Sequence, residues 1–199
     1  MKKSKLFKIL IVTCILFIFF LFSKDNKIII NQNDIKKIDN FDIIITKGQS
    51  LQSKILKILN LSSDNFTHVG FICKEKDKIY ILHATPDGTN DNCIRYDNLQ
   101  TFIDLSDVNY FVIIRSKNAI INTKAINKTI KKIKSSKVKF DYDFNNYDKT
   151  KLYCSELVYD IYNDNGLIKT KINLEKPIHP KEFLKLKEFM KVYERKSKK

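Results

Sequence analysis

The chain has 199 residues and a formal charge of +15, from 37 lysines and arginines against 22 aspartates and glutamates. This length suits one domain of ordinary size, and the 43% of hydrophobic residues can bury a core. Low glycine and proline contents exclude collagen-like and linker sequences, and the four cysteines, none in a CxxC pair, argue against a disulfide scaffold or a zinc ribbon.

The excess of lysine raises the question of a nucleic-acid partner. The lysines are spread along the whole chain, whereas nucleic-acid-binding proteins gather basic residues on one face or in a recognisable module. Separately, the sequence contains neither a Walker A motif nor GxGxxG, so a nucleotide-binding fold lacks its usual support. We therefore expect no nucleic-acid partner, and attraction to an anionic envelope surface, or solubility alone, accounts better for the charge.

The first segment of the chain, residues 1–23, has the layout of a membrane anchor. Four lysines among the first eight residues precede an apolar run over 9–22, which is about long enough to span a thin bilayer. The run ends in bulky residues without an Ala-x-Ala-like site, which favours an uncleaved anchor over a cleaved signal peptide. The lysines are expected to stay in the cytoplasm, which places the rest of the chain outside it.

After the anchor we expect a polar tether over 24–40 and a compact domain over 41–199. Hydrophobic patterns predict strands over 41–46, 67–73, 78–83, 93–96, 109–115 and 189–193. They predict helices over 49–59, 123–134 and 152–165. Two further short helices are expected, one that follows Asp97 as its cap and one that begins at Pro180. Helices and antiparallel hairpins in one chain indicate the α+β class.

Three residues in these elements carry reactive chemistry. His68 and His83 lie on two strands joined by the short connection 74–77, so both imidazoles are expected to approach the same face of the sheet. Cys154 lies in the first turn of a predicted helix, where backbone N–H groups favour the thiolate and lower the pKa of the thiol. Cys154, one imidazole and a second polar group that orients it would make a cysteine nucleophile system.

Structural interpretations of the same residues stand beside this one. A buried cysteine is usually a small hydrophobic residue, and a histidine on a strand is usually structural. A zinc site formed by His68, Cys73 and His83 is disfavoured because His68 and Cys73 point to opposite faces of their strand. Outside the cytoplasm a Cys73–Cys93 disulfide is possible, which would leave Cys154 as the free thiol.

The order of several motifs resembles that of a known family, the YiiX-like proteins. These are circularly permuted papain-fold enzymes of the NlpC superfamily, related to the lecithin–retinol acyltransferase group. The motifs, which span about residues 41–185, are Asp42-Ile-Ile-Ile, Thr67-His68-Val-Gly-Phe, Leu82-His83-Ala, Phe140-Asp-Tyr-Asp-Phe144, Leu152-Tyr-Cys154-Ser-Glu-Leu-Val158 and Ile178-His-Pro180. The resemblance implies a permuted papain-like (NlpC-type) fold, with an antiparallel sheet packed against helices and the histidine strand before the cysteine helix.

The resemblance also implies roles for individual residues. Cys154 would be the nucleophile, His68 its base and His83 the orienting group, a position where YiiX-like members often have Glu and acyltransferase relatives have His. The sequence departs from the family at Phe41, because a glycine usually precedes the aspartate that corresponds to Asp42. Glu156 is expected to form structural hydrogen bonds rather than to take part in catalysis, and His179 to be a turn residue.

The implied activity is acyl transfer through a thioester on Cys154, with no metal or organic cofactor. The expected substrate is an amide or ester bond in a cell-envelope peptide or lipid, which a membrane-anchored domain outside the cytoplasm can reach. A non-catalytic envelope-binding module that keeps the fold is the alternative, and it would not need a reactive thiol at Cys154.

Overall fold

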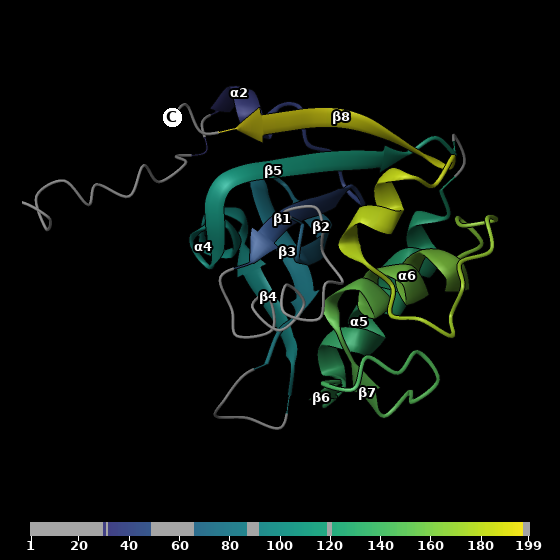
Figure 1. Cartoon of the computed structure of the whole chain (residues 1–199). Helices are drawn as coiled ribbons and strands as arrows, with labels where there is room; N and C mark the ends of the chain where they lie inside the picture. The colour runs from purple at the N-terminus through teal and green to yellow at the C-terminus, as the bar shows by residue number, and fades with distance from the viewer. Residues whose placement is uncertain (1–29, 31, 49–65, 87–91, 119–120, 197–199) are drawn as a thin grey trace, which may run out of the picture.

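The computed structural model describes residues 30, 32–48, 66–86, 92–118 and 121–196 (Figure 1). The expected anchor over 1–23 and the helix expected over 49–59 lie outside these residues. Within them, no helix has the length and apolar character needed to cross a membrane. The elements are α2 (Gln32–Ile35), β1 (Ile43–Gly48), β2 (His68–Glu75), β3 (Lys78–Ala84), β4 (Ile94–Asn98), α4 (Leu99–Asp104), β5 (Ser106–Ser116), α5 (Thr123–Ser135), β6 (Lys139–Phe140), β7 (Lys151–Leu152), α6 (Cys154–Asp164), η1 (Pro180–Leu184) and β8 (Phe189–Lys196).

The architecture is α+β, as the sequence pattern predicts. Six strands form one sheet in the order β4-β3-β2-β1-β5-β8, and every neighbouring pair is antiparallel. The short strands β6 and β7 form a separate parallel pair. β2 lies in the interior of the large sheet, so the strand that begins at His68 is hydrogen-bonded on both sides.

Helices cover both faces of the large sheet. α5 and α6 lie on one side of strands β1–β4, and α4 lies on the other side (Figure 1). The α6 side buries alternate strand residues such as Val69, Phe71 and Leu82 together with Leu157 and Val158 of α6. The α4 side buries the intervening strand residues in a second cluster around Phe102. Each strand therefore presents one half of its side chains to each core.

One turn and one helix cap differ from the sequence expectation. The β2–β3 connection is shorter than the expected 74–77, because Glu75 pairs with Lys78 and only Lys76 and Asp77 form the turn. Lys76 has a φ of 54°, in the left-handed region that tight hairpins require. The helix α4 is capped by Asn98, whose side chain accepts a hydrogen bond from the N–H of Thr101 at 2.9 Å. The prediction that Asp97 caps this helix is therefore wrong.

The polar segment before the domain contributes to the fold. Residues 32–35 form α2, and Ile38 is fully buried in the core on the α4 side. Asp42, which precedes β1, is also buried, and its carboxylate accepts hydrogen bonds from Nε and Nη2 of Arg115 at 2.8 and 2.9 Å. These contacts fix the start of β1 against β5.

Phe41 has a positive φ of 71°, a conformation that favours glycine. Its N–H donates to the carbonyl of Ile72 at 2.9 Å, and its own carbonyl accepts from the hydroxyl of Tyr162. Its ring is buried, with its centroid 5.9 Å from that of Phe71. This is the position where the family resemblance leads one to expect glycine, so the backbone keeps the glycine conformation although the side chain is large.

Candidate active site

The two strand histidines are in direct contact. Nε2 of His68 and Nδ1 of His83 lie 3.0 Å apart. Phe71 pairs with Leu82, so the register continued by one residue sets Gly70 opposite His83 and makes His68 its diagonal neighbour. The imidazoles therefore lie on the same face of the sheet, as the sequence predicts.

A second contact continues this line onto the next strand. Nε2 of His83 lies 3.0 Å from Oδ2 of Asp97 on β4. Arg95 holds the same carboxylate, with its Nε 2.9 Å from Oδ2 and its Nη2 3.1 Å from Oδ1. The sequence analysis missed both residues as part of the site. The signal that could have found them is their spacing on β4, since Arg95 and Asp97 lie on one face and His83 pairs with Arg95.

Phe102 of α4 covers both imidazoles. Its ring stacks on His68 with the centroids 5.2 Å apart, and it meets His83 edge-on at 4.9 Å. Gly70 makes room for this packing, because a Cβ at that position would collide with the side chain of Ile81 and lie 3.2 Å from the Phe102 ring. Phe102 thus shields the contact between His68 and His83 from solvent. His83 is buried, while His68 is partly buried.

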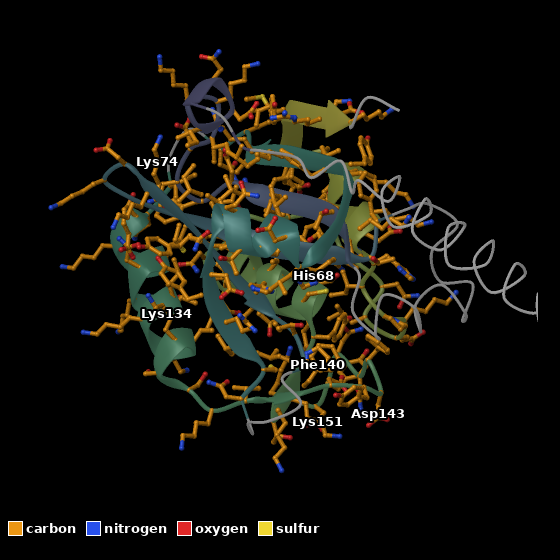
Figure 2. All side chains as sticks on the ribbon, turned by 90° about the vertical axis from the view of Figure 1, so that its left-hand side faces the viewer. His68, Lys74, Lys134, Phe140, Asp143 and Lys151 are labelled. Atoms are coloured by element: carbon orange, nitrogen blue, oxygen red, sulfur yellow. The ribbon has the colours of Figure 1, made fainter. Side chains whose placement is uncertain are left out.

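Cys154 lies in the first turn of α6, as the sequence predicts, although the helix begins at Cys154 itself and not at residue 152; its side chain is buried. α6 packs on the face of the sheet opposite to the two imidazoles, and the thiol lies against the backbone N–H of Val69, the residue after His68. Cys154 therefore lies next to the strand residue that follows His68, while the ring of His68 itself packs beside α4 (Figure 2). The hydrogen bonds of the described residues do not include one between Sγ of Cys154 and His68.

Burial controls the protonation states at this end of the sheet. It raises the pKa of the Cys154 thiol, and the N–H groups of Val69, Ser155 and Cys154 itself only partly offset this rise. Burial also lowers the pKa of His68 well below its ordinary value, and the neighbouring His83 lowers it further. The N–H groups at the start of α6 do lower the pKa of the thiol, as the sequence predicts, but the loss of water outweighs them and the net shift is upward. Thiol and imidazole are both neutral at rest.

The residue before the cysteine anchors the start of α6. Tyr153 is buried, and its hydroxyl donates to Oδ1 of Asn146 and accepts from the N–H of Ile178 at 2.7 Å. Nδ2 of Asn146 in turn donates to the carbonyls of Leu174 and Lys176 at 2.8 and 2.7 Å. Tyr153 thus joins the loops before and after α6, which fixes the backbone next to Cys154.

Glu156 lies on α6 and is fully buried. Its Oε1 accepts a hydrogen bond from Nζ of Lys149 at 2.8 Å, which is the structural kind of contact that the sequence analysis expects, and its Oε2 has no partner among the described residues. Burial raises the pKa of Glu156 to about 7, although Lys149 opposes the shift. Nζ of Lys149 also contacts Asp160, so the cluster lies along α6.

The remaining histidine and cysteines lie outside this arrangement. His179 precedes Pro180 as the N-cap of η1, in agreement with its expected turn position. Cys73 and Cys93 are buried free thiols, so the possible Cys73–Cys93 disulfide does not form. Burial raises the pKa of each to about 12. In the described residues no group of three or more His, Cys, Asp and Glu side chains is placed to hold a metal ion. His68, Cys73 and His83 therefore form no such group either.

The fold is similar to a crystal structure described as metalloprotein yiiX from Escherichia coli O157:H7, with a TM-score of 0.65 and 17% sequence identity over 81% of this chain and 99% of that chain. The word metalloprotein applies to that structure, and within residues 32–48, 66–86, 92–118 and 121–196 of this chain no group of side chains is placed to hold a metal ion. A search of curated proteins found no match.

A sequence profile gives the family. The profile described as permuted papain-like amidase enzyme, YaeF/YiiX, C92 family, matches residues 40–195, which is most of the chain and all of the strands that carry the site. The chain therefore belongs to the permuted papain-like amidases of the YaeF/YiiX, C92 family, and it is a cysteine hydrolase.

Proposed function

We propose that the protein hydrolyses an amide bond in a cell-envelope substrate, with Cys154 as nucleophile, His68 as general base and acid, and His83 as the group that orients His68. The observation that carries this proposal is the 3.0 Å contact between Nε2 of His68 and Nδ1 of His83. This contact occupies one ring nitrogen of His68, and Nδ1 has no hydrogen-bond partner among the described residues. The thiol of Cys154 lies against Val69, directly after His68.

The first half of the reaction acylates the enzyme. Nδ1 of His68 takes the proton from Sγ of Cys154 as the sulfur attacks the substrate carbonyl, because a neutral thiol is a weak nucleophile. Backbone N–H groups at the start of α6 are suited to stabilise the negative charge that develops on the carbonyl oxygen. The C–N bond then breaks, His68 returns the proton to the leaving amine, and a thioester on Cys154 remains.

The second half of the reaction releases the acyl group. A water molecule gives a proton to Nδ1 of His68 and attacks the thioester carbonyl. The C–S bond breaks, the carboxylic acid leaves, and the sulfur of Cys154 recovers the proton from His68. Each step returns His68 to the neutral state in which it began, and that neutral state agrees with its lowered pKa.

The proposed location and substrate rest on residues 1–23. An anchor there, with its lysines in the cytoplasm, would tether the enzyme to the membrane with the catalytic domain outside, next to wall peptides and lipids. The family supports an amide rather than an ester as the bond cleaved. The net charge of +15 favours anionic envelope polymers or head groups near the domain.

The test is a release assay on two envelope fractions with the full-length protein. Purified wall peptides and phospholipid vesicles are incubated separately, and new amines, carboxylic acids and free fatty acids are measured by mass spectrometry. The proposal predicts new amines from the peptide fraction and an acyl adduct on Cys154. Cys154→Ala should abolish both, while the matched control Cys73→Ala, which removes a buried thiol outside the site, should keep them. Release of fatty acids alone would contradict the proposed amide substrate and show that the enzyme cleaves lipid esters. Turnover by Cys154→Ala would contradict the assignment of Cys154 as the nucleophile.

A further inference from the structure

A line of hydrogen bonds runs across three adjacent strands behind the proposed base. It begins at Nε2 of His68 on β2, passes through both nitrogens of His83 on β3, and ends at the carboxylate of Asp97 on β4. Both intervals measure 3.0 Å. Beyond this end, Arg95 donates two hydrogen bonds to the carboxylate of Asp97. The inference drawn from this line rests on the proposed function of His68.

With Asp97 ionised and both imidazoles neutral, the three side chains allow only one arrangement of protons. An ionised carboxylate only accepts hydrogen bonds, so Nε2 of His83 must carry the proton that it donates to Asp97. In a neutral imidazole the other nitrogen then has the lone pair, so Nδ1 of His83 accepts from Nε2–H of His68. The proton of His68 is thereby placed on Nε2, and its Nδ1 keeps the lone pair that can take a proton from a thiol.

The arrangement depends on Asp97 being ionised and the imidazoles being neutral. Burial alone would raise the pKa of Asp97, but the hydrogen bonds from His83 and Arg95 outweigh it and lower the pKa to about 2. Burial lowers the pKa of His83 despite the nearby carboxylate, as it lowers that of His68. Phe102 contributes to this burial by packing on both rings.

We propose that Asp97, held by Arg95, is a positioning residue that fixes the tautomers of His83 and His68 and so keeps the lone pair of His68 on Nδ1. Asp97 has no contact with Cys154 among the described residues and acts only through His83. Without it, His83 can present a proton instead of a lone pair to His68. In part of the population the proton of His68 would then be on Nδ1, and this nitrogen could no longer act as a base.

Nitrogen-15 NMR of the full-length protein tests the tautomers without any substrate. The chain has three histidines, so spectra of the wild type and of His179→Gln assign the site rings. The proposal predicts Nε2 protonated and Nδ1 unprotonated in both His68 and His83. In Asp97→Ala the two rings should lose this single pattern and show mixed tautomers, whereas Asp97→Asn, which keeps an acceptor oxygen, should lose less of it. A wild type with the proton on Nδ1 of His68, or an Asp97→Ala spectrum that keeps the original pattern, would overturn the proposal.

Alkylation of Cys154 by iodoacetamide tests the consequence for the thiol. The rate at neutral pH should fall about tenfold or more in Asp97→Ala, with Asp97→Asn between it and the wild type. Above the thiol pKa the three rates should converge, because hydroxide then removes the proton without His68. A loss of fold would lower or raise rates at every pH and would not produce convergence. The matched control is Asp104→Ala, an exposed aspartate of α4 that accepts a hydrogen bond from Gln100 and should leave the profile unchanged.

Arg95→Gln provides a milder variant if Asp97→Ala folds poorly. It keeps the carboxylate but removes two of its hydrogen bonds, so the pKa of Asp97 should rise and the single tautomer pattern should be lost at a higher pH than in the wild type. The two proposals can fail separately. A correct tautomer pattern together with an inactive enzyme would refute the proposed function, whereas an active enzyme with an Asp97-independent pattern would refute the role of Asp97.

Discussion

His68 and His83 share one hydrogen bond, 3.0 Å long, between Nε2 of the first ring and Nδ1 of the second. The family resemblance allows either glutamate or histidine at this position, and the contact shows how a histidine can fill it. A glutamate at this position would accept the hydrogen bond of His68 with its carboxylate, whereas His83 accepts it with a ring nitrogen. The negative charge that a glutamate would carry at this position lies instead on Asp97, one strand further along the sheet.

The first prediction concerns substitutions of His83. His83→Gln retains an acceptor oxygen for Nε2–H of His68 and should keep part of the turnover, while His83→Ala should lose more, because nothing then orients the ring. The decrease should be in kcat with little change in KM, since His83 is buried and is proposed to act only through His68. Steady-state kinetics normalised to the folded fraction measure this. Equal activity per folded molecule in wild type and both variants would show a merely structural His83.

A second prediction uses the buried carboxylate of Glu156. Its pKa is about 7 in the folded protein and 4.5 in an unfolded chain, so between these values the folded state binds a proton that the unfolded state has lost. The contribution of Glu156 to stability is therefore greatest at low pH and is lost as the pH rises from 4.5 to 7. Glu156→Gln removes this titration. It should stabilise the protein more at pH 8 than at pH 5, by about 2 kcal/mol.

Denaturant unfolding at both pH values measures the difference for Glu156→Gln. Asp164→Asn is the matched control, because this exposed aspartate lies at the end of the same helix and its replacement should have a small effect at either pH. A Glu156→Gln effect that is the same at pH 5 and pH 8 would contradict the raised pKa.

The third prediction separates backbone strain from burial at Phe41. Phe41→Gly relieves the positive φ but removes a buried ring, and the ring is worth more: about 3–5 kcal/mol against about 1–2 kcal/mol for the strain. Both Phe41→Gly and Phe41→Ala should therefore destabilise the protein. Phe41→Ala should be the worse by about 1 kcal/mol, because alanine loses the ring and keeps the strain. Equal unfolding free energies for the two variants would contradict the claim that the positive φ of residue 41 costs stability.

Local patterns in the sequence predict much of the sheet. Runs of residues that favour strands over 67–73 and 78–83 identify β2 and β3, and the short connection between them places His68 and His83 on one face. The helix pattern over 152–165 identifies α6 and sets Cys154 in its first turn. The resemblance to the YiiX-like proteins is confirmed by the family profile. All of these features depend on neighbours close in the sequence or on motif order.

The features that the sequence does not reveal depend on long-range packing. Asp97 and Asn98 can both cap a helix, and which one does so follows from the β3–β4 register, which points Asp97 at His83. The pKa of the Cys154 thiol depends on how completely α6 and β2 exclude water, and the residues around Cys154 in sequence carry no sign of this. The parallel pair of β6 and β7 is too short to leave a pattern.

The pairing of His68 with Cys154 is the central claim, and the alkylation rate of Cys154 as a function of pH tests it most directly. If His68 removes the thiol proton as proposed, iodoacetamide should react with the wild type at neutral pH although burial raises the pKa of the thiol. In His68→Ala the rate at neutral pH should fall strongly and recover only as the pH approaches that of the unassisted thiol. His179→Ala, which removes the histidine outside the site, should follow the wild type. An alkylation profile of His68→Ala that coincides with the wild type would contradict the Cys154–His68 pair.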